Sequence, residues 1–227
     1  MNKLYNLLGV VGGLYTIIFV YISTIISPNF SWVGNYLSDI GAGQFGNTPA
    51  LIFNSTLIIG GIILAIFFLL SLISVNGIVP RISLLIMFIG SLSLSLIGVF
   101  TENSPFGLHK IFSYGFFLLL PIAMIIFSFH YFRKKTYFGL FTILMAIVAL
   151  GIIMDLPFGG GKAIPEIGEA LILSIWVIVF SILQYMGKLK KNNIYGINLL
   201  KFLIFYHFNE KNHLQKISLS AINKIYL

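Results

Sequence analysis

The sequence predicts an all-α integral membrane protein: a six-helix transmembrane bundle followed by a short C-terminal tail that is interfacial or disordered. Three observations predict it. Of the 227 residues, 58% are hydrophobic and 9% are charged, whereas soluble domains average about 45–50% and about 25%. Charged residues are missing from several runs long enough to cross a bilayer. These runs are continuously apolar rather than alternating, which favours helices over a barrel.

The charge-free runs locate the helices in order. They cover 4–38, 40–80, 82–101, 111–132, 136–154 and 170–187. Because a helix needs about 20 apolar residues to cross the hydrocarbon, we expect spans at 5–26, 51–73, 82–100, 111–132, 137–154 and 167–186. The predicted division is therefore a six-span transmembrane domain over 1–186 and a basic cytoplasmic tail over 187–227. Pro121 falls inside the fourth span and predicts a kink there.

The basic residues predict the orientation. With six spans and a cytoplasmic N-terminus, every Lys and Arg except Lys110 and Lys162 lies on the cytoplasmic side, as the positive-inside rule requires. We therefore expect a multi-pass protein of the cell membrane with both termini cytoplasmic. The basic tail is expected to contact anionic lipid. No basic stripe with interleaved aromatics occurs outside the tail, so no nucleic-acid partner is expected.

Polar residues gather at the predicted outer end of the bundle and form the candidate site. Glu166 and Glu169 lie three residues apart, which places them on one side of the sixth helix. The long first outer loop contains a stretch, 31–41, that is expected to form a short helix across the mouth of the bundle. The candidate outer-face residues are Ser38, Asp39, Glu102, His109, Asp155, Glu166 and Glu169.

Several functions fit such a site. The favoured hypothesis is recognition of a lipid head group or a partner, with membrane lipid as the expected ligand. The alternative is a membrane-embedded lipid-modifying enzyme of hydrolase type, with His109 as base and the carboxylates holding a hard divalent cation. A simpler interpretation gives these residues only structural roles, as helix-terminus charges and ion pairs. The sequence assigns no cofactor and no oligomeric state, and charge-free spans argue against a transporter.

Short motifs point to a family. NYLSDIG at 35–41, IFN at 52–54, GVFTE at 98–102 and then His109 resemble the multi-pass family known as domain of unknown function 998. That family is distantly similar to the six-helix DRAM/Frag/Sfk group. The resemblance covers roughly 5–186 and implies a six-helix bundle without an established activity. Its family-like positions are Ser38, Asp39, Gly41, Glu102 and His109. The membrane hydrolases that include alkaline ceramidases need several histidines at a zinc site, which the spans lack.

Overall fold

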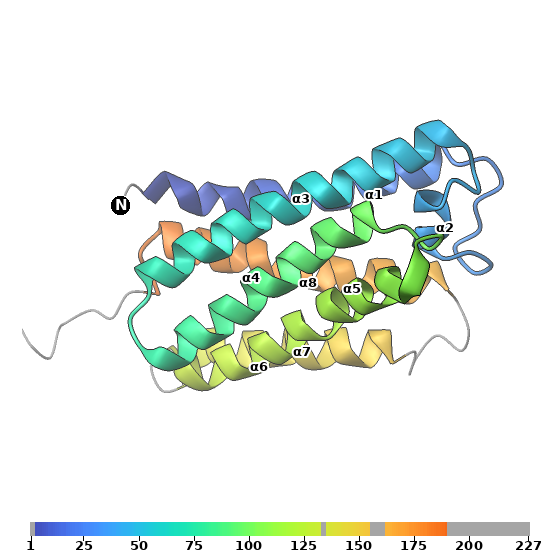
Figure 1. Cartoon of the computed structure of the whole chain (residues 1–227). Coiled ribbons are helices and arrows are strands. Elements are labelled where there is room, and N and C mark those ends of the chain that lie inside the picture. The colour runs from blue at the N-terminus through green and yellow to red at the C-terminus, as the bar shows by residue number, and fades with distance from the viewer. Residues whose placement is uncertain (1–2, 133–134, 155–161, 190–227) are drawn as a thin grey trace, which may run out of the picture. The chain divides into compact units, whose positions relative to one another are not determined.

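The computed structural model describes residues 3–132, 135–154 and 162–189, and every regular element in them is a helix. Figure 1 shows the long helices running side by side along one common direction. In chain order the elements are η1 (Lys3–Asn6), α1 (Leu7–Ile25), α2 (Leu37–Gly41), α3 (Asn47–Ser74), α4 (Ile78–Val99), η2 (Pro105–Gly107), α5 (Leu108–Phe117), α6 (Leu119–Phe132), α7 (Thr136–Ile153) and α8 (Ala163–Tyr185). The predicted all-α class is confirmed.

The long helices form a closed ring. Helix α1 packs against α3, α3 against α4, and α4 against both α5 and α6. The ring continues from α6 to α7 and from α7 to α8, and α8 packs back against α1. The first and last long helices of the bundle are therefore neighbours, and the ring surrounds a common interior.

Five helical segments are long and apolar enough to cross a membrane, namely Lys3–Ile25, Asn47–Ser74, Ile78–Val99, Pro105–Phe132 and Ala163–Tyr185. The remaining one, Tyr137–Ile153, is apolar but shorter. Each expected span thus falls on a helix, and the protein is a membrane bundle. The short helix expected within 31–41 is present only as α2, over its last five residues.

Three helices begin about one turn before the expected spans. Each of them, α3, α4 and α8, has proline as its third residue, at Pro49, Pro80 and Pro165. The first four N–H groups of a helix have no partner within the helix, so proline costs little there. The apolar run therefore predicts the part of each helix that crosses the membrane, and the proline marks the first turn, where the helix begins.

The kink predicted at Pro121 is confirmed. The fourth span is divided into α5 and α6, with Leu118 between them. Proline has no N–H to donate to the carbonyl four residues earlier, at Phe117, and its ring crowds that turn. The break therefore lies within one turn before the proline.

Glycines bring α3 and α4 into close contact. A Cβ atom built on Gly61 would lie 2.6 Å from the backbone nitrogen of Ser95, and one on Gly98 would lie 2.5 Å from the carbonyl oxygen of Asn54. Backbone atoms of the partner helix occupy the space that a side chain would need. Small residues at such contacts let membrane helices approach closely.

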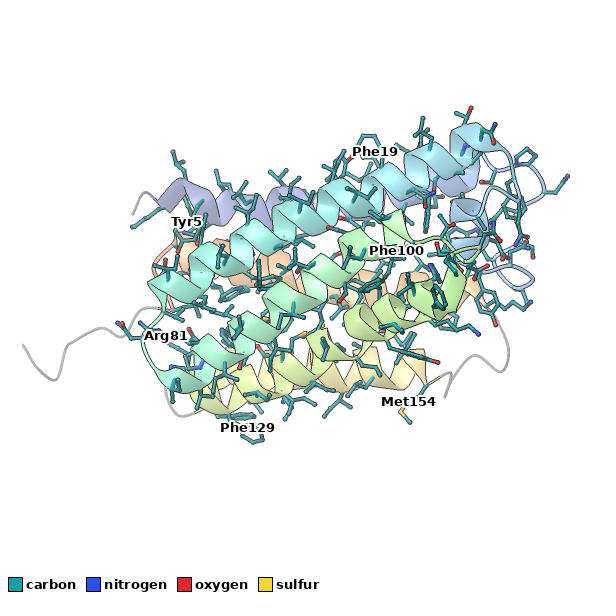
Figure 2. The ribbon with its side chains drawn as sticks, viewed as in Figure 1. Tyr5, Phe19, Arg81, Phe100, Phe129 and Met154 are labelled. Atoms are coloured by element: carbon teal, nitrogen blue, oxygen red, sulfur yellow. The ribbon has the colours of Figure 1, made fainter. Side chains whose placement is uncertain are left out.

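The two ends of the bundle differ in charge. The N-terminus, the α3–α4 turn and the end of α8 lie at one end, where Figure 2 labels Tyr5 and Arg81. The loops before α3, α5 and α8 lie at the other end, which we call the acidic end. It carries the described carboxylates Asp39, Glu102, Glu166 and Glu169. Arg81, Lys135 and Lys188 belong to the opposite end, as the positive-inside pattern predicts.

Large apolar side chains cover the outside of the bundle. Phe19 and Phe129 point away from the helices in Figure 2 and are 40% and 62% exposed. Similar residues recur along every long helix, including Leu171 on α8 at 40%. A surface of this kind is suited to lipid chains rather than to water.

The chain divides after Leu189 into two units, and the second, Lys190–Leu227, lies outside the described residues. Most of the tail predicted for 187–227 therefore lies there, together with its expected contact with anionic lipid. Asp155 also lies outside the described residues.

Candidate functional site

Two glutamates fasten α2 to the acidic end of the bundle. The backbone N–H of Leu37 donates to Glu166 Oε2 at 2.7 Å, and the hydroxyl of Ser38 donates to Glu102 Oε1 at 2.6 Å. One glutamate comes from α8 and the other from the loop after α4. Hydrogen bonds to a charged acceptor are about twice as strong as neutral ones. This short helix is therefore held by groups distant in sequence rather than by its own length.

Asp39 has a local structural role. Its Oδ2 accepts the backbone N–H of Tyr36 at 2.9 Å, which caps the start of α2. Asn35 Nδ2 donates to the same oxygen at 3.4 Å, and Gln44 Nε2 donates to Oδ1 at 2.9 Å. Both oxygens of this carboxylate are thus used to shape the loop, which favours the capping role that the simpler interpretation gives to a carboxylate.

His109 lies near the start of α5 with its ring position fixed. Its Nδ1 is 2.8 Å from the carbonyl oxygen of Phe100, the residue that ends α4. A carbonyl oxygen only accepts, so Nδ1 carries a hydrogen and donates it. One turn later, the Ser113 hydroxyl donates to the His109 carbonyl at 2.8 Å. The Nε2 atom of His109 is therefore the ring atom left for other partners.

The loop before α3 is tied down by residues that the sequence analysis did not select. Asn54 Nδ2 donates to the Gly41 carbonyl at 2.9 Å, and Asn103 Nδ2 donates to the Ala42 carbonyl at 3.3 Å. The Ala163 N–H donates to the Trp32 carbonyl at 3.2 Å. The asparagines within the NYLSDIG, IFN and GVFTE region were a usable signal, because amide side chains commonly satisfy loop carbonyls.

A cavity lies inside the ring, beneath α2. The space open to the centre of a water-sized molecule inside it is about 80 Å³. The polar residues Ser38, His109, Ser113 and Glu166 line it near the acidic end, and we call this group the polar mouth. Apart from Thr16 and Ser174, the rest of the lining is apolar and comes from most of the ring, including Leu57, Phe68, Met87, Leu94, Phe116, Met124, Leu173 and Trp176.

The structure brings together part of the predicted site. Ser38, His109 and Glu166 line the cavity, whereas Asp39 and Glu102 support α2 from outside its lining. Glu169 does not line the cavity. It is fully buried, and neither of its oxygens has a hydrogen-bond partner within residues 3–132, 135–154 and 162–189. Residues three apart on a helix differ by about 60° in direction, which is enough to separate Glu166 from Glu169.

One lysine at the acidic end, Lys162, contacts an aromatic ring of the first outer loop. The Nζ atom of Lys162 lies 5.0 Å from the centroid of the Tyr36 ring, a cation–π contact. Within residues 3–132, 135–154 and 162–189, no three His, Cys, Asp or Glu side chains are close enough to hold one metal ion. The hard-cation site of the enzyme hypothesis is therefore not assembled by the described residues.

The comparison with known proteins agrees with the motifs. No curated protein and no solved structure matches the chain. The family described as "Protein of unknown function (DUF998)" matches residues 10–183. The match begins in α1 and ends in α8, so it contains the whole ring, the loop that carries α2 and the polar mouth. On this evidence the chain belongs to the DUF998 family of membrane proteins.

Proposed function

We propose that the protein binds a membrane lipid, with a hydrocarbon chain in the cavity and the head group at the polar mouth. The observation that carries the proposal is a largely apolar interior in which four of the six polar lining residues, those of the polar mouth, lie at one end, while Thr16 and Ser174 line it farther in. Ligand pockets commonly pair an apolar lining with a few placed polar groups. An amphiphile has the same division along its length.

The depth of the cavity fits one lipid chain. Its lining on α8 runs from Glu166 to Val177, which at 1.5 Å per residue is about 16 Å. This is about half of the roughly 30 Å hydrocarbon core, the depth that belongs to one leaflet. A hydrocarbon chain in the cavity would make dispersion contacts with its apolar lining.

Neighbouring residues on α8 allow a matched test. Ala170 lines the cavity, whereas the adjacent Leu171 faces outward. Trp176 also lines the cavity, and the chain has only one other tryptophan. In a Trp32→Phe background, fluorescence of Trp176 therefore reports on the cavity. The probe is dibromo-octadecanol added to the detergent-solubilised protein, because bromine on the chain quenches a nearby indole.

We expect saturable quenching at about one probe per protein. Ala170→Phe fills the cavity and should weaken binding by about tenfold or more, the equivalent of at least 1.4 kcal/mol. Leu171→Phe adds apolar bulk one residue away and should leave binding unchanged. Quenching that does not saturate, or that is the same in both variants, would contradict the proposal.

We further propose that the polar mouth faces the outside of the cell, with both termini in the cytoplasm. The chain contains no cysteine, so one introduced cysteine is a unique label. Asn103 and Asn76 are both exposed and lie at opposite ends of the bundle. A membrane-impermeant maleimide should label Asn103→Cys in intact cells and Asn76→Cys only after permeabilisation. The reverse pattern would invert the proposed orientation.

A further inference from the structure

We infer that the head group at the polar mouth is a protonated primary amine, a cationic hydrogen-bond donor, rather than a phosphate or a carboxylate. The inference rests on the proposed function and adds the chemical class of the ligand. Its basis is that the Ser38 and Ser113 hydroxyls and His109 Nδ1 already donate their hydrogens to groups of the protein, which leaves these residues to act as hydrogen-bond acceptors for a ligand.

Both serines at the mouth are committed as donors. Ser38 donates its hydroxyl hydrogen to Glu102 Oε1 at 2.6 Å, and Ser113 donates its own to the His109 carbonyl at 2.8 Å. A hydroxyl has one hydrogen and two lone pairs. With that hydrogen engaged elsewhere, each serine oxygen offers only acceptor capacity to a ligand in the cavity.

In its neutral form His109 is an acceptor for the same reason. Its Nδ1 hydrogen is donated to the Phe100 carbonyl at 2.8 Å. In the neutral ring the other nitrogen, Nε2, then has no hydrogen and carries a lone pair. The imidazole therefore offers a ligand an acceptor, as the serines do.

Glu166 adds the one carboxyl side chain among the described lining residues. Its Oε2 accepts the Leu37 N–H at 2.7 Å, while its Oε1 accepts no hydrogen bond from the described residues. No lysine or arginine is among the described residues that line the cavity. An anionic head group would face acceptors and a carboxylate with no donor to meet it, which is costly where water is excluded. An ammonium group brings positive charge and three N–H donors.

A chain-matched series tests the head group directly. Four probes carry the same dibromo-octadecyl chain and end in a primary amine, a trimethylammonium, an alcohol or a carboxylate. Quenching of Trp176 in the Trp32→Phe protein gives each affinity. We expect the amine to bind about tenfold more tightly than the alcohol, as a charge-assisted hydrogen bond allows. Trimethylammonium, which has charge but no N–H, should fall between them, and the carboxylate should bind most weakly.

Two glutamine substitutions separate the mouth from the general charge of the acidic end. Glu166→Gln keeps an oxygen that can accept the Leu37 N–H but removes the charge, so the amine should lose most of its advantage over the alcohol. Lys110→Gln also removes one ionisable group from the acidic end, at an exposed side chain that does not line the cavity, and its amine preference should stay within about twofold of the starting protein.

The outcomes distinguish the two proposals. If no probe binds saturably, the proposed lipid-binding function fails. If all four bind equally, or the carboxylate binds most tightly, lipid binding stands and the amine inference is overturned. Equal affinity of the amine and the trimethylammonium would overturn its hydrogen-bond basis. Changes of equal size in Glu166→Gln and Lys110→Gln would overturn the assignment to the polar mouth.

Discussion

Gly61→Ala should lower the melting temperature of the purified protein by on the order of 10 °C. The new Cβ would lie 2.6 Å from the Ser95 nitrogen and 2.7 Å from the Ser91 carbonyl oxygen. Both are backbone atoms of α4, which cannot turn aside as a flexible side chain would. The two helices would have to separate, and overpacking of this kind costs typically about 1–3 kcal/mol. A thermal unfolding curve in detergent measures the effect.

Gly151 provides the control. It lies in α7, and a Cβ built there meets no atom within 4 Å. Gly151→Ala should therefore keep or slightly raise the melting temperature, since alanine favours a helix over glycine by about 1 kcal/mol. If the Gly61→Ala and Gly151→Ala proteins have the same melting temperature, the close approach of α3 and α4 is not what stabilises the bundle.

Glu169→Met should raise the melting temperature by on the order of 5 °C. The glutamate side chain is fully buried, and both of its oxygens lack a partner. A buried polar group without a hydrogen bond costs about 1–3 kcal/mol, and methionine has a similar length without the polar oxygens. The gain is measured by thermal unfolding in the same detergent.

Glu169→Gln tests the reason for that gain. Glutamine keeps the shape but still places a polar amide where no partner is available, so its melting temperature should stay below that of Glu169→Met. A Glu169→Met protein less stable than the starting protein would show that the carboxylate is satisfied by a group on which the bundle depends.

The sequence was sufficient to locate the helices to within about one turn and to predict how charge divides between the two ends of the bundle, because the membrane imposes a strong rule on both. A run without charge that is long enough to cross has one low-energy conformation in lipid. The basic residues then determine which loops share an end. Pro121 predicted the break between α5 and α6 by the same kind of local reasoning, since a missing N–H acts within one turn.

The arrangement of the acidic end was less accessible to sequence reasoning. The bond from Leu37 to Glu166 joins residues 129 apart, and its donor is a backbone group with no sequence signature. Asp39, Glu102 and Glu169 looked like members of one cluster. In the structure Asp39 caps α2, Glu102 supports α2, and Glu169 is a buried acid apart from them. Glu169 is separated from Glu166, three residues earlier on α8, because the two side chains point in different directions around the helix.

The cavity is also not predictable from the sequence, but for a different reason. Leu94, Met87 and Met124 line the cavity, whereas Leu84 does not. Leu84 and Met87 are both fully buried, so burial does not distinguish a residue of the filled core from one that lines the cavity. The same residue types build a filled core and a hollow one. The difference is the summed volume of many side chains from different helices, which no short pattern records.

The contact between α1 and α8 has a consequence for biogenesis. The Ser181 hydroxyl donates to the Asn6 carbonyl, and Gln184 links to both Tyr5 and Ser71. These bonds join η1, which directly precedes α1, and α3 to α8. Until α8 has been made, the ring of helices is open between α1 and α7, and the interior that Thr16 lines lacks its α8 wall. Insertion of α8 is therefore the step that encloses the cavity.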